Sequence, residues 1–366
     1  MAYNWQLRDW PEFSYDVQDI DDELLAFAEQ IGQMSGTLKG MSEDLRIEAI
    51  IDIMVAEAIK TSEIEGEHLS RQDVMSSIRN NLGLNKKPEV IKDKRAQGAG
   101  ELMVAVRESF SAPLAESELF AWHSLLMKEN RGIVVGAWRS GGAPMQVISG
   151  ALGREVVHFE APPSAAVPKE MNRFIEWFNA TAPGGRHEIK KAPVRSAIAH
   201  LYFETIHPFE DGNGRMGRAI AEKALSQTIG RPVLLSISKT IEAEKKAYYN
   251  ALKEAQKGNE ISNWIKYFVH VILQAQTQAL DIVDFILKKT SFFDSFKELN
   301  ERQLKAVKRM FDAGPNGFEG GMTAQKYMSL THTSKATATR DLQGLLEMNA
   351  LILEGGGRST RYRLNI

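Results

Sequence analysis

The sequence predicts a mainly α-helical protein with one short β-hairpin and a small mixed unit at its C-terminal end. Apolar residues recur at helical spacing along most of the chain, and residues 47, 50, 51, 54 and 58 form one such stripe. Strand character is limited to residues 145–159 and 351–364. With 366 residues, 43% of them hydrophobic and 25% charged, the chain is typical of globular proteins and long enough for two or three domains.

Composition and charge exclude several classes of protein. The formal net charge of −2 provides no overall attraction to nucleic acid or to an anionic membrane. The chain has no cysteine, which excludes disulfides and thiolate metal sites. Its first residues lack the features of a signal peptide, and no run of about 18 apolar residues is present to span a membrane. We therefore expect a cytoplasmic protein without membrane contact.

Helical patterns account for most of the chain. Before the hairpin we expect helices at 21–38, 42–61, 92–110 and 116–128, and Ser70-Arg71-Gln72-Asp73 resembles a capping box that opens a further helix. After the hairpin we expect helices at 168–182, 192–206, 241–256 and 261–287. The helix at 192–206 has Pro193 in its first turn and ends before Pro208, so His207 should lie where a side chain can face a cleft.

The run from His207 to Arg218 concentrates the chemistry of the chain. Gly212 and Gly214 permit positive φ, and Asn213 between them tolerates the left-handed region, so successive N–H groups would form a concave anion-binding nest. A second helix follows, and its positive end would point at the same anion. Arg215 and Arg218, three residues apart, can both reach phosphate oxygens, and Asp211 offers the oxygen ligand that Mg²⁺ prefers.

This run resembles the signature of the Fic family, H-P-F-x-[D/E]-G-N-G-R-x-x-R, with every fixed position present. The resemblance implies a mostly helical fold and transfer of AMP from ATP to a protein hydroxyl. It implies that His207 is the general base, Phe209 anchors the loop in the core and Asp211 holds Mg²⁺. Phosphate binding would fall to the remaining signature residues: Gly212, Asn213, Gly214, Arg215 and Arg218.

Three further segments extend the resemblance. Thr61, Glu65 and Gly66 satisfy the inhibitory motif of Fic proteins, [S/T]-x-x-x-E-[G/N], which implies that Glu65 pairs with Arg218 and denies the γ-phosphate its place. The hairpin corresponds to the flap that holds the target segment as an added strand, through Val147, Ile148, Val156 and Val157. Tyr248 and Tyr249 resemble a pair that borders the adenine, although packing is an equally good explanation; Gln256 stands where Asn is expected.

The tail resembles a winged helix-turn-helix. A helix through residues 304–311, a short helix at 322–328, a recognition-type helix at 334–348 and a small wing follow in that order. From Met322 onward the sequence contains six lysines and arginines and three acidic residues, and this excess of positive charge is compatible with phosphate contacts. DNA binding and protein–protein contact are both open. We expect three domains: an N-terminal region at 1–95 with the inhibitory motif, a Fic core at 96–289 and the winged helix at 290–366.

These observations lead to one main hypothesis and two alternatives. The main hypothesis is a self-inhibited adenylyltransferase that uses ATP and Mg²⁺ to modify a Tyr, Thr or Ser hydroxyl of a target protein or of itself. Within the same class, the enzyme could remove AMP or transfer another nucleotide. In a different class, the chain would be a DNA-binding regulator whose Fic domain senses nucleotide. The target protein is not evident from the sequence, and a homodimer is compatible with it.

Overall fold

In the computed structural model the described residues are 2–130, 132–149 and 156–366. They form two compact units: residues 1–40 with 50–279, and residues 41–49 with 280–366. Both are built mainly from helices, as the apolar periodicity predicted. None of the described helices is long and apolar enough to cross a membrane.

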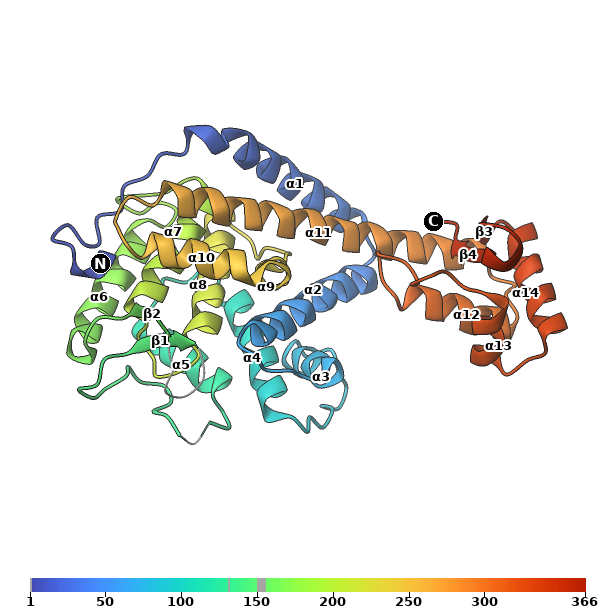
Figure 1. Ribbon diagram of the computed structural model, residues 1–366, viewed down its shortest axis with the longest axis horizontal. Helices are drawn as coiled ribbons and strands as arrows, with labels where there is room; N and C mark the ends of the chain where they lie inside the picture. The colour runs from blue at the N-terminus through green and yellow to red at the C-terminus, as the bar shows by residue number, and fades with distance from the viewer. Residues whose placement is uncertain (1, 131, 150–155) are drawn as a thin grey trace. The chain divides into compact units, whose positions relative to one another are not determined.

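The first unit is a helical assembly with one hairpin (Figure 1). Its helices before the hairpin are α1 (Asp21–Gly40), α2 (Glu43–Ile64, of which residues from 50 on belong here), α3 (Arg71–Asn81), α4 (Lys94–Glu108) and α5 (Glu116–Leu126). After the hairpin come α6 (Val167–Ala180), α7 (Ala192–Ile206), α8 (Asn213–Ile229), α9 (Ile237–Ala243), α10 (Lys245–Ala255) and the start of α11 (Ser262–Ser295). In α2, Ile51, Met54 and Ala58 are buried, which confirms the apolar stripe in this part of the helix.

Helix α7 packs along α8, and each of its residues is buried. A helix covered on all sides must satisfy its polar side chains internally. Ser196 donates to the backbone carbonyl of Ala221 in α8 at 2.8 Å, and the Nε2 of His200 lies 2.8 Å from the hydroxyl of Tyr248 in α10. These contacts fix α7 against α8 and α10, and therefore fix the loop that joins α7 to α8.

The hairpin is confirmed. Strands β1 (Gln146–Ser149) and β2 (Val156–Glu160) pair antiparallel, with Gln146 opposite Glu160 and an irregularity between Val147 and Ile148. Most of its predicted turn, residues 150–153, lies outside the described residues, as do the side chains of Ile148 and Val156.

Two helices differ from the prediction. The expected helix at 241–256 is two helices, α9 and α10, separated at Glu244, where the backbone is non-helical (φ −127°, ψ 41°). Helix α9 begins earlier because the Ser236 side chain caps it by accepting the Lys239 N–H at 3.1 Å. The apolar pattern continues across Glu244, so periodicity alone did not reveal the break. Helix α11 extends to Ser295, beyond its predicted end at residue 287.

The second unit contains α12 (Glu301–Phe311), α13 (Ala324–Thr331), α14 (Lys335–Glu347) and the strands β3 (Leu351–Glu354) and β4 (Arg361–Leu364). The two strands pair antiparallel, with Leu351 opposite Leu364. Asn300 caps α12 by accepting the N–H groups of Arg302 and Gln303, both at 3.0 Å. The core includes Phe292, Val307, Phe311, Tyr327, Leu342 and Leu345. This order of elements matches the predicted one, and its assignment as a winged helix stays a prediction.

Candidate functional site

The loop between α7 and α8 is closed by its own asparagine. Asn213 receives the Phe209 N–H on its Oδ1 at 2.9 Å and donates from Nδ2 to the Phe209 carbonyl at 2.8 Å. Phe209 is fully buried, as expected of an anchor. The backbone expectation was only partly right, because Gly212 has a φ of +80° whereas Asn213 and Gly214 already belong to α8. The Asn213 side chain therefore shapes the loop, and its amide is committed to the backbone.

Two residues outside the signature, His123 and Arg139, contact the loop between α7 and α8 and fix its position. The ring of His123 stacks on Phe209 with 4.0 Å between centroids, and its Nε2 lies 3.1 Å from the carbonyl oxygen of Asp211. Arg139 is buried and donates from Nε to the His207 carbonyl at 2.7 Å. Arg139 was not predicted from the sequence: it also donates from Nη1 to Ser164 Oγ at 2.9 Å, and its other partners are backbone carbonyls that no motif records.

His207 lies at the C-terminal end of α7 in the left-handed conformation (φ 51°, ψ 59°), which directs its side chain away from the helix and into the pocket. Its Nδ1 is 3.8 Å from Oε2 of Glu204, one turn earlier. Burial, and secondarily Arg139, lowers the pKa of His207 to about 4. The imidazole is therefore neutral at neutral pH, which is the form a general base requires.

Glu204 is a site residue that the sequence analysis missed. Burial raises the pKa of its carboxyl to about 8, although Arg218 acts in the opposite direction. Its Oε1 has no hydrogen-bond partner among the described residues. A Cβ at Gly217 would lie only 2.3 Å from that oxygen, so the glycine leaves room for it. A glutamate one turn before a candidate base was the available signal.

Both signature arginines are paired with carboxylates from the segment that follows α2. Arg218, nearly fully buried, donates from Nη2 to Glu65 Oε1 at 2.7 Å and from Nε to Thr61 Oγ1 at 2.7 Å. Arg215 donates from Nη1 to Glu67 Oε2 at 2.9 Å. Burial alone would raise the pKa of Glu65, but the Arg218 guanidinium outweighs it and the pKa is lowered.

Gly214 gives the Glu65 carboxylate its place. A Cβ at Gly214 would lie 2.3 Å from Glu65 Oε1, so the carboxylate occupies the space that the glycine leaves open in the first turn of α8. The N–H groups and dipole of a helix N-terminus attract negative charge at this position. Glu65 therefore lies in the position where the sequence analysis predicts a bound phosphate.

A cavity of about 620 Å³, large enough for a nucleotide, is lined by Glu65, Glu204, His207, Gly214 and Arg218. The hairpin contributes Val147, His158 and Phe159, and the α10 segment contributes Tyr248, Tyr249 and Gln256. Tyr248 is buried and tied to His200, whereas Tyr249 is 38% exposed and freer to contact a ligand. Val157 is exposed on β2.

Asp211 is the one predicted metal ligand and also lines the cavity. Its Oδ1 accepts the Gly212 N–H at 2.6 Å, which leaves lone pairs on the carboxylate for a cation. Among the described residues there is no group of three or more His, Cys, Asp or Glu able to hold a metal ion. Asp211 fits the manner in which proteins bind Mg²⁺ through one or two carboxylates together with substrate phosphates.

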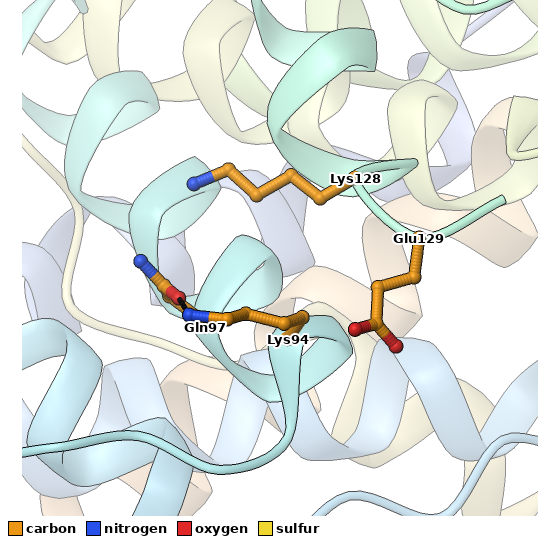
Figure 2. A pocket seen from close by; sticks show the side chains of 4 residues that line it. All are labelled: Lys94, Gln97, Lys128 and Glu129. Atoms are coloured by element: carbon orange, nitrogen blue, oxygen red, sulfur yellow. Dashed lines mark hydrogen bonds between the residues drawn. The ribbon is translucent and has the colours of Figure 1, made fainter.

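A second hollow of about 600 Å³ is lined by Lys94, Gln97, Lys128 and Glu129 (Figure 2). Lys94 donates to Gln97 at 2.8 Å, and Lys128 pairs with Glu101. Because both ammonium groups already have partners, we place the functional site in the cavity that His207 lines.

Comparison with known proteins agrees with this choice. Residues 113–225 match the Fic/DOC family, and this part of the chain is a Fic domain. Residues 3–84 match a domain of unknown function (DUF4172). Glu65 and Glu67 thus come from the N-terminal domain, and the arginines that they pair with come from the Fic domain.

The relatives extend the comparison. Over 112 residues the chain is 31% identical to proteins named "Protein adenylyltransferase Fic" from Drosophila willistoni and Drosophila mojavensis, a match that covers 31% of this chain and 20% of each relative. The chain thus spans about a fifth of the length of these relatives. A Fic family protein from Desulfovibrio desulfuricans has a similar fold, with a TM-score of 0.56 and 22% identity over 97% of this chain and 98% of that one. A Fic-domain signalling protein from Bacteroides thetaiotaomicron has a TM-score of 0.52 and 18% identity, covering 72% and 97% of the two chains.

Proposed function

We propose that this protein is a self-inhibited protein adenylyltransferase that transfers AMP from ATP to a hydroxyl of a target protein or of itself. The observation that carries the proposal is the position of Glu65, whose carboxylate lies in the space left by Gly214 and on the guanidinium of Arg218. An anion in that position marks the site as one built for negative charge. The Fic domain and its adenylyltransferase relatives support the choice of ATP.

In the proposed reaction the target hydroxyl attacks the α-phosphorus of ATP. His207 accepts the hydroxyl proton, an oxygen–phosphorus bond forms, and the bond from the α-phosphorus to the bridging oxygen breaks. Pyrophosphate leaves with the electrons of that bond, and its charge is taken up by Arg215 and Arg218. Mg²⁺ held by Asp211 and phosphate oxygens would neutralise the triphosphate. The hairpin would present the target as an added strand, with Val147, Ile148, Val156 and Val157 as its docking residues.

The proposal is tested by transfer of labelled AMP. Because Glu65 pairs with Arg218, Glu65→Gly should raise transfer or self-modification above the wild-type level. In that background, His207→Ala should lower transfer roughly 100- to 10,000-fold, the usual effect of losing a general base. The matched control is His187→Ala, which removes an exposed imidazole of the same unit. Full transfer by the His207 variant would contradict the assignment of His207 as the general base. If Glu65→Gly transferred no AMP, the proposal that the protein is an adenylyltransferase would be wrong.

Two related activities share this site. In AMP removal, Glu65 would position a water that attacks the phosphorus of the attached AMP; the bond from that phosphorus to the target oxygen breaks, AMP leaves and the hydroxyl is restored. In the other activity, a different nucleoside triphosphate would be the donor. Incubation of Glu65→Gly with each labelled triphosphate identifies the donor, and incubation of the wild-type protein with an adenylylated target tests removal. Loss of label that requires Glu65 would favour the removing enzyme.

For the second unit we propose a winged helix-turn-helix that binds DNA. The basic residues Lys335 and Arg340 are exposed on α14, the recognition-type helix of the prediction, whereas Arg363 on β4 is already paired with Glu354 at 2.5 Å. Fluorescence anisotropy of a duplex with the full chain tests this. Binding that weakens steeply with salt, and that weakens further in Lys335→Gln/Arg340→Gln, supports DNA contact. No binding at low salt would favour docking of a protein partner.

A further inference from the structure

The two signature arginines are in similar electrostatic positions. Arg215 is 4% exposed, and within the described part of the chain Glu67 is the carboxylate that pairs with it directly, at 2.9 Å. Its Nη2 otherwise faces the Met127 sulfur at 4.0 Å, and its Nε has no hydrogen-bond partner among the described residues. A guanidinium this buried depends on the carboxylate that pairs with it, and it would accept another anion in the same place.

The turn at the end of α2 explains how both carboxylates reach their arginines. The N–H of Glu67 donates back to the Ser62 carbonyl at 2.9 Å, and that of Gly66 to Glu63 at 3.0 Å. Gly66 has a φ of +83°, and a Cβ there would meet nothing within 4 Å. Glycine is therefore required at this position for its backbone conformation rather than for space.

That turn reverses the chain between Glu65 and Glu67. The two carboxylates, separated by one residue, then meet two arginines separated by one helical turn of α8. Two anchors hold the turn: Lys60 pairs with Glu63 at 2.5 Å, and the ammonium of Lys245 donates to the Ile64 carbonyl.

We propose that Glu67 is a second inhibitory residue, which neutralises Arg215 while Glu65 neutralises Arg218. The ligand displaced in both cases is the same chemical class, the β- and γ-phosphates of a nucleoside triphosphate. This inference rests on the proposed function, because it assumes that both arginines serve the leaving phosphates. Removing Glu65 alone leaves Arg215 paired with Glu67, so the enzyme is only partly released from inhibition.

The experiment measures binding of Mg·ATP by calorimetry for the full-length wild type and for Glu65→Gln, Glu67→Gln and the double variant. Gln keeps the shape of the side chain and removes its charge. We expect each single variant to bind ATP about tenfold more tightly than wild type and the double variant to bind more tightly than either, since each freed guanidinium regains a phosphate partner. AMP, which lacks the β- and γ-phosphates, should bind all four proteins equally.

The control is Asp52→Asn, on the same helix α2, because Asp52 pairs with Arg71 and not with an arginine of α8. It should bind ATP as the wild type does. Glu67→Asp keeps the charge on a shorter side chain, and it should bind ATP with an affinity between wild type and Glu67→Gln. Thermal melting checks that every variant is folded.

The outcomes separate the two hypotheses. Wild-type affinity in Glu67→Gln, with tighter binding in Glu65→Gln, would overturn the second inhibitory residue and leave the proposed function intact. Equal tightening for ATP and AMP would also overturn it, because the effect would not involve the phosphates that Arg215 serves. No ATP binding by the double variant would reject the proposed function itself.

Discussion

Two buried arginines, on the paired helices α7 and α8, have their charge compensated in different ways. Arg195 in α7 is fully buried and donates only to neutral oxygens, and burial lowers its pKa to about 10. Its acceptors are Thr181 Oγ1, Thr228 Oγ1, Gln227 Oε1 and the carbonyls of Phe178 and Ala224. Arg218 in α8 is equally buried, and although burial would lower its pKa, Glu65 outweighs that effect and raises it.

The difference separates a structural arginine from one available to a ligand. The acceptors of Arg195 belong to the helices around it and cannot leave without unfolding them. The counter-charge of Arg218 comes from the N-terminal domain, and its Nη1 still has no hydrogen-bond partner among the described residues. An incomplete set of partners and a removable carboxylate are what a binding arginine requires.

The largest expected difference between the two arginines is in the stability lost when each is replaced. Arg195→Met removes five hydrogen bonds that join α7 to three side-chain oxygens and two carbonyls of the neighbouring segments, so we expect the free energy of unfolding to fall by about 3–5 kcal/mol. Arg218→Met combined with Glu65→Gln removes a charge and its counter-charge together, and we expect a loss of roughly 1–2 kcal/mol. Urea unfolding followed by circular dichroism measures both. A larger loss in the double variant would contradict the structural role assigned to Arg195.

Glu204 allows a second test, near Arg218. Its pKa is about 8 in the folded protein, against an ordinary value of 4.5, so between these values the folded state binds a proton that the unfolded state has lost. Stability therefore falls as pH rises from about 4.5 to about 8, by at most roughly 1.4 kcal/mol per pH unit. Glu204→Gln lacks this loss.

The advantage of Glu204→Gln over wild type should therefore grow from about pH 5 to about pH 8 in urea unfolding. A matched measurement on Glu222→Gln, which replaces a second carboxyl whose pKa desolvation raises to about 8, tests whether the effect is general. A constant difference between Glu204→Gln and wild type across this range would contradict the raised pKa of Glu204.

The sequence predicted the parts of this site that depend on local rules. Pro208 ends α7, Gly212 has the positive φ that its position suggested, and Ser70 caps α3 by accepting the Asp73 N–H at 3.3 Å. The pairing of Glu65 with Arg218 was implied by the resemblance to the inhibitory motif of Fic proteins. The parts of the site that were not predicted depend on contacts between segments that are distant in the sequence.

Arg139 and Glu67 illustrate the limit. Apart from the Ser164 hydroxyl, Arg139 donates to backbone carbonyls, which carry no residue identity, so no pattern of side chains predicts its contacts with the loop. Glu67 reaches Arg215 only because of the reversal at Gly66, and the two residues are 148 positions apart. Gly214 was assigned a positive φ, whereas the structure uses its missing side chain to make room for Glu65.

The smallest expected effect concerns the pH dependence of the Glu65–Arg218 pair. The pKa of Glu65 is lowered in the folded protein, so the pair is fully formed above the ordinary carboxyl value of 4.5 and is lost only as pH falls through the lowered pKa. The ratio of Mg·ATP affinities between Glu65→Gln and wild type should therefore stay constant, within about twofold, from about pH 6 to about pH 9. Calorimetry at several pH values measures it. A ratio that falls steadily toward pH 6 would mean that Glu65 is already gaining a proton there, and the carboxylate would then be too weakly held by Arg218 to keep phosphate out at neutral pH.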